Sequence, residues 1–327
     1  MRILILCIAI FLNACASTKS GNPRYNKDLD SYPYPFSVSK FEFKSQRQNL
    51  SMAYMDLNSS SKKVIVLLHG KNFGAYYWDF IAKDLVEQGY RVIMPDQIGF
   101  GKSSKPDHYQ YSFYQLAHNT LQLLKSLSID SFTLVGHSMG GMLATHLTYY
   151  RPDQVQKLIL INSIGLEPYL DLVEYKDPEF FYQSELGKTP EKMRNYQKAN
   201  YYDGKWSDRY EQLLVPHLGQ MNHPDWKIIA WNNALTYGPI FSEDITTKMS
   251  SIKVPTRIIN GTRDRTGPGR GWKKSKSTKL GQYQVLGKQV AKRFPNAKLY
   301  ELDNLGHMPH FEDYPRFKKV LLKALSQ

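Results

Sequence analysis

The chain has very little cysteine, because only Cys7 and Cys15 occur among its 327 residues. Both lie near the N-terminus, so the rest of the chain can form no internal disulfide. The apolar run from Ile3 to Leu12 is too short for a membrane-spanning helix, which needs about 20 apolar residues. Stability must therefore come from an ordinary buried core, for which 327 residues with 42% hydrophobic side chains are ample.

The first residues predict an export signal, since Arg2 precedes the apolar run and small residues follow it. The sequence LNAC resembles a bacterial lipobox, in which Cys15 becomes the lipid-bearing first residue, although Asn13 is less usual there. The sequence ACA also fits ordinary signal cleavage. A cysteine at the one position that lipidation needs favours a lipoprotein, and Ala16 resembles the outer-membrane sorting pattern. We expect a lipid-anchored protein of the outer membrane facing the periplasm, with a secreted or periplasmic protein as the alternative.

The net charge of +14 predicts attraction to polyanions such as anionic lipids or acidic substrates. Nucleic acid is not expected as a partner, because the positive charge is spread along the chain and no recognition motif occurs. The most basic stretch is NGTRDRTGPGRGWKKSKSTKLG, residues 260–281, with Asp264 as its one acidic residue.

Short strands alternating with helices indicate an α/β fold with a mostly parallel sheet covered on both faces. Residues 16–35 are polar with Pro and Gly and predict a tether. Period-two alternation or solid apolar runs predict strands within 36–43, 50–57, 62–70, 90–96, 131–138, 157–163, 256–261 and 297–303. Helical periodicity covers Tyr76 to Gln88, Tyr111 to Leu127 and Met139 to Tyr150.

The interval 166–253 contains no strand of the buried type and is rich in aromatic side chains. Its helical stretches predict an insertion at one edge of the sheet, where it would act as a lid. Most of its aromatic residues should form a local core, while some should face the cleft. The expected organisation is signal and lipobox over 1–15, tether over 16–35, first core part over 36–165, helical lid over 166–253 and second core part over 254–327.

The sequence LVGHSMGG places the pattern G-x-S-x-G, with Gly136, Ser138 and Gly140, between a predicted strand and a predicted helix. A serine on such a sharp turn can present its Oγ only if the residues two before and two after it are small. The helix that follows favours negative charge developing beside the serine. The context predicts that Ser138 is a nucleophile rather than a helix cap.

A serine nucleophile needs a base and an acid that orients the base. His307 follows the last predicted strand and a glycine-containing turn, so it is preferred as the base over His310. Asp264 follows the strand TRIING and is preferred as the acid over Asp303, which we interpret as a turn residue. The chain order Ser138, Asp264, His307 is the order associated with α/β-hydrolases.

Five segments in this order resemble the landmark blocks of α/β-hydrolase-fold serine hydrolases: VLLHGKNFGAYYWD, VIMPDQIGFGKSSKP, LVGHSMGGMLA, NGTRD and LDNLGHMPHFE. The resemblance covers about residues 40 to 325 and implies an eight-stranded-type sheet with a helical lid. It also implies an oxyanion hole made by the backbone N–H groups of Met139 and Lys71. His69, two residues before Lys71, is expected to be structural.

The same resemblance separates related activities. A serine nucleophile excludes the aspartate-dependent dehalogenases and epoxide hydrolases of this fold. His137 stands where carbon–carbon hydrolases often carry Asn, and Met139 stands where proline iminopeptidases typically carry Trp.

The run GFGKSS is not a P-loop, because Asp96 occupies the position of its first glycine. No H-E-x-x-H pattern occurs, so we expect neither a metal nor a cofactor.

The expected function is hydrolysis of an ester or thioester of small-to-medium size through an acyl-enzyme. A carbon–carbon hydrolase of the ring-cleavage type and a non-catalytic envelope binding protein are the alternatives. The loop after Asp264 should lie at the ligand-binding edge of the sheet. Its cations, Lys273, Lys274, Lys276 and Lys279, are expected to contact anionic lipid or an acidic substrate, with a merely solvated loop as the alternative.

Overall fold

The computed structural model describes residues 23–327. The predicted export signal, the lipidation site Cys15 and the first part of the predicted tether lie outside the described residues. Within residues 23–327 no helix is both long enough and apolar enough to cross a membrane.

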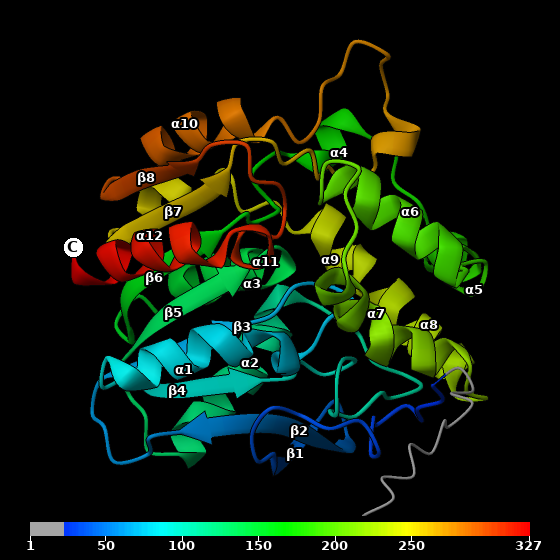
Figure 1. Ribbon diagram of the computed structural model, residues 1–327, viewed down its shortest axis with the longest axis horizontal. Coiled ribbons are helices and arrows are strands. Elements are labelled where there is room, and N and C mark those ends of the chain that lie inside the picture. Colours follow the sequence, from blue (N-terminus) through cyan, green and yellow to red (C-terminus); the bar gives the residue numbers. More distant parts are fainter. Residues whose placement is uncertain (1–22) are drawn as a thin grey trace, which may run out of the picture.

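One eight-stranded sheet forms the centre of the molecule, in the order β1-β2-β4-β3-β5-β6-β7-β8 (Figure 1). Strands β1 and β2 pair antiparallel, as do β2 and β4, and all other pairs are parallel. The predicted mostly parallel sheet is therefore confirmed. The strands are β1 Ser39–Ser45, β2 Gln48–Leu57, β3 Val64–Leu68, β4 Arg91–Pro95, β5 Phe132–His137, β6 Val155–Ile161, β7 Thr256–Gly261 and β8 Ala297–Leu302.

The central strands are largely apolar because helices bury both of their faces. The core helices are α1 Asp79–Glu87, α2 Phe113–Ser126, α3 Met139–Tyr150, α10 Tyr283–Arg293, α11 Pro309–Glu312 and α12 Tyr314–Ser326. Successive residues of β3 belong to two different hydrophobic clusters. Val66 and Leu68 pack with α2, α3 and α10, whereas Ile65 and Leu67 pack with α1 and α12.

Two of the predicted core helices start later than their apolar periodicity suggests. Helix α2 begins at Phe113 because the side chain of Ser112 accepts a hydrogen bond from the Gln115 N–H and so caps it. The turn before α1, Ala75–Trp78, is a 3₁₀ helix (η1). Helix α3, which follows the serine turn, spans the predicted residues 139–150.

Between β6 and β7 the chain leaves the sheet and forms a group of helices above its carboxyl edge, on the right in Figure 1. We call residues 166–253 the lid. Its helices are α4 Tyr169–Leu172, α5 Pro178–Leu186, α6 Pro190–Asn200, α7 Asp208–Met221, α8 Trp226–Leu235 and α9 Tyr237–Ser242, followed by the 3₁₀ turn η2 Met249–Ser251. Aromatic stacking holds the lid together, as in the pair Phe181 and Tyr237, whose ring centroids are 4.3 Å apart.

The prediction of a tether is wrong for residues 23–35, which pack against the rest of the protein. Leu29 is buried, and the Tyr34 hydroxyl donates to Asp96 over 2.7 Å. The Tyr25 N–H donates to the carbonyl of Gly219 in α7. Burial of the aromatic side chains and of Leu29 stabilises the packed segment, which its polar, Pro-containing composition does not suggest. This segment therefore joins the lid to the core.

Candidate active site

Ser138 occupies the sharp turn between β5 and α3, with φ 55° and ψ −121°. This left-handed conformation is costly for a residue with a side chain and is held by the surrounding structure. The Ser138 N–H donates to the carbonyl of Ile161. A Cβ on Gly136 would lie 2.2 Å from the carbonyl oxygen of Gly140, and a Cβ on Gly140 would lie 2.2 Å from that of Leu68. The two glycines are therefore sterically required, as the sequence pattern predicts.

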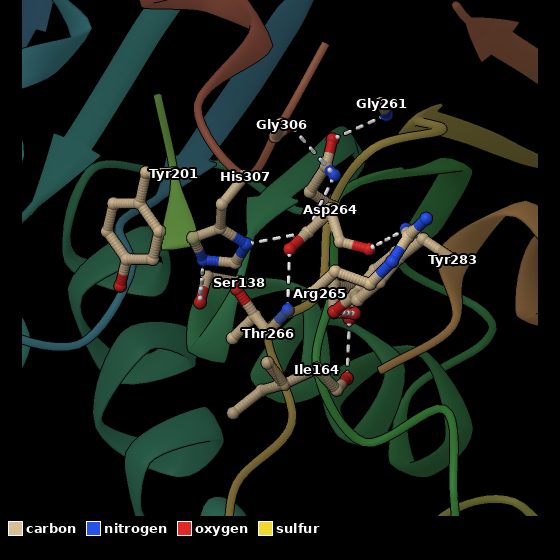
Figure 2. Close-up of polar contacts among 12 residues, drawn as sticks. Ser138, Ile164, Tyr201, Gly261, Asp264, Arg265, Thr266, Tyr283, Gly306 and His307 are labelled. Carbon is tan, nitrogen blue, oxygen red and sulfur yellow. Dashed lines mark hydrogen bonds and ion pairs between the residues drawn. The ribbon is translucent and has the colours of Figure 1, made fainter. Parts of the chain in front are cut away.

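The structure brings Ser138, His307 and Asp264 together from three separate loops (Figure 2). His307 Nε2 lies 3.0 Å from Ser138 Oγ, and His307 Nδ1 lies 2.8 Å from Asp264 Oδ2. The carboxylate accepts, so Nδ1 carries the proton and Nε2 is left to accept the proton of the serine hydroxyl. Asp264 and His307 are almost fully buried, while Ser138 keeps 8% of its surface exposed. A serine that stays accessible beside an oriented base is suited to nucleophilic attack.

Asp264 is held as a carboxylate by several donors. Burial acts to raise its pKa, but the charge and hydrogen bond of His307 and the hydrogen bonds of Thr266 and Asn162 together lower the pKa below its usual range. Asn162, at the end of β6, also accepts a hydrogen bond from the Gly261 N–H and donates to the carbonyl of Gly306. Sequence reasoning missed Asn162; its only signal is an amide directly after an apolar strand.

A second hydrogen-bond chain connects His137 to the catalytic loops. The His137 Nε2–H donates to the carbonyl of His307 over 2.9 Å, and Nδ1 lies 3.1 Å from the Tyr77 hydroxyl. Because Nε2 carries the ring proton, Nδ1 accepts a hydrogen bond from the Tyr77 hydroxyl, which in turn accepts one from the Gly70 N–H. Burial, aided by the charge of His307, lowers the pKa of His137 to about 3. A neutral His137 therefore joins the His307 backbone to the loop that contains Lys71.

The two predicted oxyanion donors lie beside the serine. Gly70 precedes Lys71 and is so close to the nucleophile that a Cβ on it would lie 3.1 Å from Ser138 Cβ. Among residues 23–327, neither the Lys71 N–H nor the Met139 N–H donates to another protein group. Both donors are thus free for a substrate oxygen.

The side chain of Lys71 contacts the lid, which the sequence did not indicate. Its Nζ donates to the Asn233 carbonyl over 2.6 Å and to Thr236 Oγ1 over 2.8 Å, and it lies 4.0 Å from the ring centroid of Tyr237. Burial lowers the pKa of Lys71 to about 7, although the charge of Glu185 opposes the change. Lys71 therefore links the predicted oxyanion loop to α8 and α9.

A cavity of about 470 Å³ lies over Ser138, between the lid and the loop after Asp264. This size is within the usual range for small-molecule sites. Tyr201 at the end of α6 lies against His307, with ring centroids 4.7 Å apart (Figure 2). Tyr196 and Tyr237 also line the cavity, whereas Phe181 and Tyr202 are buried elsewhere in the lid. The lid aromatics are thus divided between cavity wall and local core.

The basic loop also divides into two parts. Residues 265–272 form one wall of the cavity. Lys273, Lys274, Lys276 and Lys279 lie outside it, and all but Lys273 are exposed. The ammonium groups of Lys273 and Lys274 donate to the carbonyls of Thr278 and Leu170.

Three other residues considered from the sequence, His69, His310 and Asp303, are not part of the hydrogen-bonded array of Ser138, His307 and Asp264. His69 is buried, with Nε2 accepting from the Gln97 N–H. His310 lies among aromatic rings, and neither of its ring nitrogens has a hydrogen-bond partner among the described residues. Asp303 is exposed on the turn after β8. No cluster of three or more His, Cys, Asp or Glu side chains suited to a metal ion occurs within residues 23–327.

Known proteins share this architecture. The family model described as alpha/beta hydrolase fold matches residues 63–314. The crystal structure of a probable hydrolytic enzyme from Pseudomonas aeruginosa PAO1 superposes with a TM-score of 0.90 at 40% identity, covering 93% of this chain and 99% of that one. The AB hydrolase superfamily protein YfhM of Bacillus subtilis (strain 168) is 27% identical over 277 residues, which are 80% of this chain and 90% of that protein.

A 2-hydroxy-6-oxononadienedioate/2-hydroxy-6-oxononatrienedioate hydrolase 2 of Pseudomonas putida is 25% identical over 292 residues, which are 85% of this chain and 92% of that protein. The family match includes the strands and loops that place Ser138, Asp264 and His307. The family resemblance seen in the sequence is confirmed: the chain belongs to the alpha/beta hydrolase fold family and is a hydrolase of that family.

Proposed function

We propose that the protein is a serine hydrolase that cleaves an ester or thioester of small-to-medium size through an acyl-enzyme. The observation that supports this most is the continuous hydrogen-bonded array from Asp264 through His307 to Ser138, with the hydroxyl facing the cavity. An array of this kind activates an otherwise weak oxygen nucleophile.

In the proposed mechanism Ser138 Oγ attacks the substrate carbonyl carbon while His307 Nε2 takes the hydroxyl proton. Asp264 keeps the imidazole in the required tautomer and stabilises the imidazolium. The carbonyl oxygen becomes an oxyanion that accepts hydrogen bonds from the backbone N–H groups of Met139 and Lys71. One such donor contributes about 3 to 4 kcal/mol to transition-state stabilisation in a comparable enzyme.

Collapse of the tetrahedral intermediate breaks the bond to the leaving alcohol or thiol, which takes the proton from His307. Water then attacks the acyl-enzyme, with His307 acting as base for the water and afterwards as acid toward Ser138 Oγ. The products are a carboxylic acid and free enzyme. This second half uses the same groups in reverse order, as microscopic reversibility requires.

The test is a substrate panel measured with wild type and with Ser138→Ala. The panel includes p-nitrophenyl esters of increasing acyl length, an acyl thioester, a dienol-type diketone and a prolyl anilide. We expect ester and thioester turnover in the wild type and a loss of at least about 10³-fold in the variant. Equal rates in both proteins would contradict the mechanism.

A carbon–carbon hydrolase is the second candidate, because the Pseudomonas putida relative is named for such a reaction. It would use the same serine on a vinylogous diketone. A wild-type kcat/KM that is higher for the diketone than for every ester would favour this candidate. A folded wild type that turns over no member of the panel would instead favour a non-catalytic binding protein.

We further propose that the chain is exported and lipidated at Cys15, and that Lys273, Lys274, Lys276 and Lys279 bind anionic lipid. The sequence LNAC supports the first part, and the exposure of Lys274, Lys276 and Lys279 supports the second. Mass spectrometry of the mature N-terminus would contradict lipidation if Cys15 were absent or unmodified. Replacing the four lysines by alanine should reduce sedimentation with phosphatidylglycerol vesicles, and unchanged sedimentation would favour a solvated loop.

A further inference from the structure

The cavity over Ser138 is lined by side chains of one sign of charge. Among its lining residues are Lys71, Lys188, Lys192, Arg265 and Arg270, and none is Asp or Glu. The whole sequence holds 43 Lys and Arg against 29 Asp and Glu, so the absence of acids from the cavity wall does not follow from composition alone. A water-shielded cleft of one sign concentrates ligands of the opposite sign.

Three of these cations already have partners. Lys188 pairs with the buried Glu185 over 2.5 Å. The Nζ of Lys71 binds lid oxygens, and Arg265 Nη1 donates to two backbone carbonyls of its own loop. The donors of these three side chains are engaged within the protein.

Lys192 and Arg270 differ from the other three. Among the described residues, the Lys192 ammonium donates only to the carbonyl of Gly187, and the Arg270 guanidinium donates to the carbonyl of Leu280 over 3.3 Å. Within residues 23–327 neither side chain forms a salt bridge. Both are exposed at the rim of the cavity, where a ligand can reach them.

These two cations come from different segments that line the cavity. Lys192 is in α6 of the lid, whereas Arg270 begins the 3₁₀ turn η3 (Arg270–Trp272) in the loop after Asp264. Tyr196 follows Lys192 by one helical turn and so lies on the same face of α6. Tyr196 is about half exposed and, like Arg270, lines the cavity. Two cations and a tyrosine thus line the same cavity.

The acidic side chain Glu167 contacts the loop that contains Arg270. Its carboxylate accepts a hydrogen bond from the Gly281 N–H, and burial raises its pKa while Arg270 acts to lower it. Glu167 is not part of the cavity wall. Glu167 therefore adds no acidic group to the cavity.

We propose that the natural substrate has an anionic group, a carboxylate or a phosphate, which binds between Lys192 and Arg270 while its scissile carbonyl lies at Ser138. Phe73, Leu214 and Ile240 provide apolar wall for the part of the substrate in between. Arg and Lys both bind carboxylate and phosphate, and an Arg can do so through two parallel hydrogen bonds. This inference rests on the proposed serine-hydrolase function and adds a substrate class to it.

The test compares two substrates that differ only in a terminal charge: mono-p-nitrophenyl adipate and p-nitrophenyl hexanoate. The kcat/KM of the anionic ester divided by that of the neutral ester should fall about tenfold in Lys192→Met/Arg270→Met, mainly through KM. Added salt should reduce the wild-type ratio. The control is Lys62→Met/Lys63→Met, which removes the same charge from exposed residues that precede β3 and do not line the cavity, and it should leave the ratio unchanged.

A second pair places the charge on the leaving group: 4-acetoxybenzoate and its methyl ester. The proposed substrate class is overturned if the kcat/KM ratio of anionic to neutral ester is the same in wild type and in Lys192→Met/Arg270→Met for both substrate pairs. Inhibition of hexanoate ester hydrolysis by adipate and by 6-phosphonohexanoate, relative to hexanoate, distinguishes carboxylate from phosphate. Ser138→Ala is run alongside, because rates that do not depend on Ser138 would instead overturn the proposed function.

Discussion

The catalytic edge of the sheet and the lid are held in place in different ways. At the edge, buried hydrogen bonds connect the loops directly, as Asn162 does by contacting Asp264, Gly261 and Gly306. The lid meets the core through side-chain hydrogen bonds and aromatic packing, such as the 2.5 Å bond from the Tyr111 hydroxyl to Asn232. The core thus fixes the reacting atoms, while the lid shapes the space around the substrate.

This comparison predicts that changes at the catalytic edge lower kcat, whereas changes in the lid alter KM or stability. The largest effect is expected for Asp264→Asn, because an amide in place of the carboxylate no longer fixes the productive tautomer of His307. We expect kcat to fall by about 10³- to 10⁴-fold, with the fold retained. Stopped-flow ester hydrolysis and circular dichroism measure both quantities.

The matched control for that variant is Asp303→Asn, an exposed acid four residues before His307. Its kcat should stay within about twofold of wild type, as is usual for surface substitutions. A large loss in Asp303→Asn together with a small loss in Asp264→Asn would show that the wrong acid was identified.

An intermediate effect is expected for Tyr77→Phe. The change leaves the Gly70 N–H and His137 Nδ1 without their shared partner, so both the oxyanion loop and the His307 backbone lose support. Loss of one such hydrogen bond corresponds to roughly a tenfold lower kcat, with KM little changed. Tyr76→Phe is the control, because Tyr76 packs on Tyr32 and Tyr34 instead. An equal effect of the two substitutions on kcat would contradict a positioning role for Tyr77.

The smallest effect concerns stability and the contact between Lys71 and the lid. Burial depresses the pKa of Lys71 from 10.5 to about 7, so between these values the unfolded chain binds a proton that the folded chain does not. Lys71 should therefore increase the free energy of unfolding as pH rises from about 7 toward 10.5. Lys71→Met removes that contribution.

Urea unfolding of wild type and Lys71→Met at pH 7 and pH 9.5 measures this dependence. The stability of the wild type relative to the variant should be greater at pH 9.5 than at pH 7. An identical difference at both pH values would mean that Lys71 is not held in a buried, lid-bound environment. Comparison of the variants at one pH alone would mix this effect with the loss of hydrogen bonds to Asn233 and Thr236.

The fold and the proximity of Ser138, Asp264 and His307 could be predicted because each satisfies a strong local requirement. The Ser138 turn demands Gly136 and Gly140 on steric grounds, and strands buried on both faces leave solid apolar runs in the sequence. Asp264 and His307 each follow such a strand, so the parallel sheet brings them to the same edge as Ser138.

Contacts between distant residues could not be predicted in the same way. Tyr77 and His137 are 60 residues apart, and nothing local to either residue indicates the hydrogen bond. Amphipathic lid helices specify an apolar face but not the surface on which that face packs. Residues 23–35 show the reverse problem, because a few large side chains such as Leu29 and Tyr34 outweigh a composition typical of a tether.

The central claim is that Ser138 is the nucleophile of an array assembled at the core edge. Reaction with a fluorophosphonate followed by intact mass and peptide mass spectrometry tests it most directly. The account predicts one adduct per chain, located on Ser138 and absent from folded Ser138→Ala, with much slower labelling of His307→Ala. An adduct on another residue, or a folded wild type that is not labelled, would contradict it.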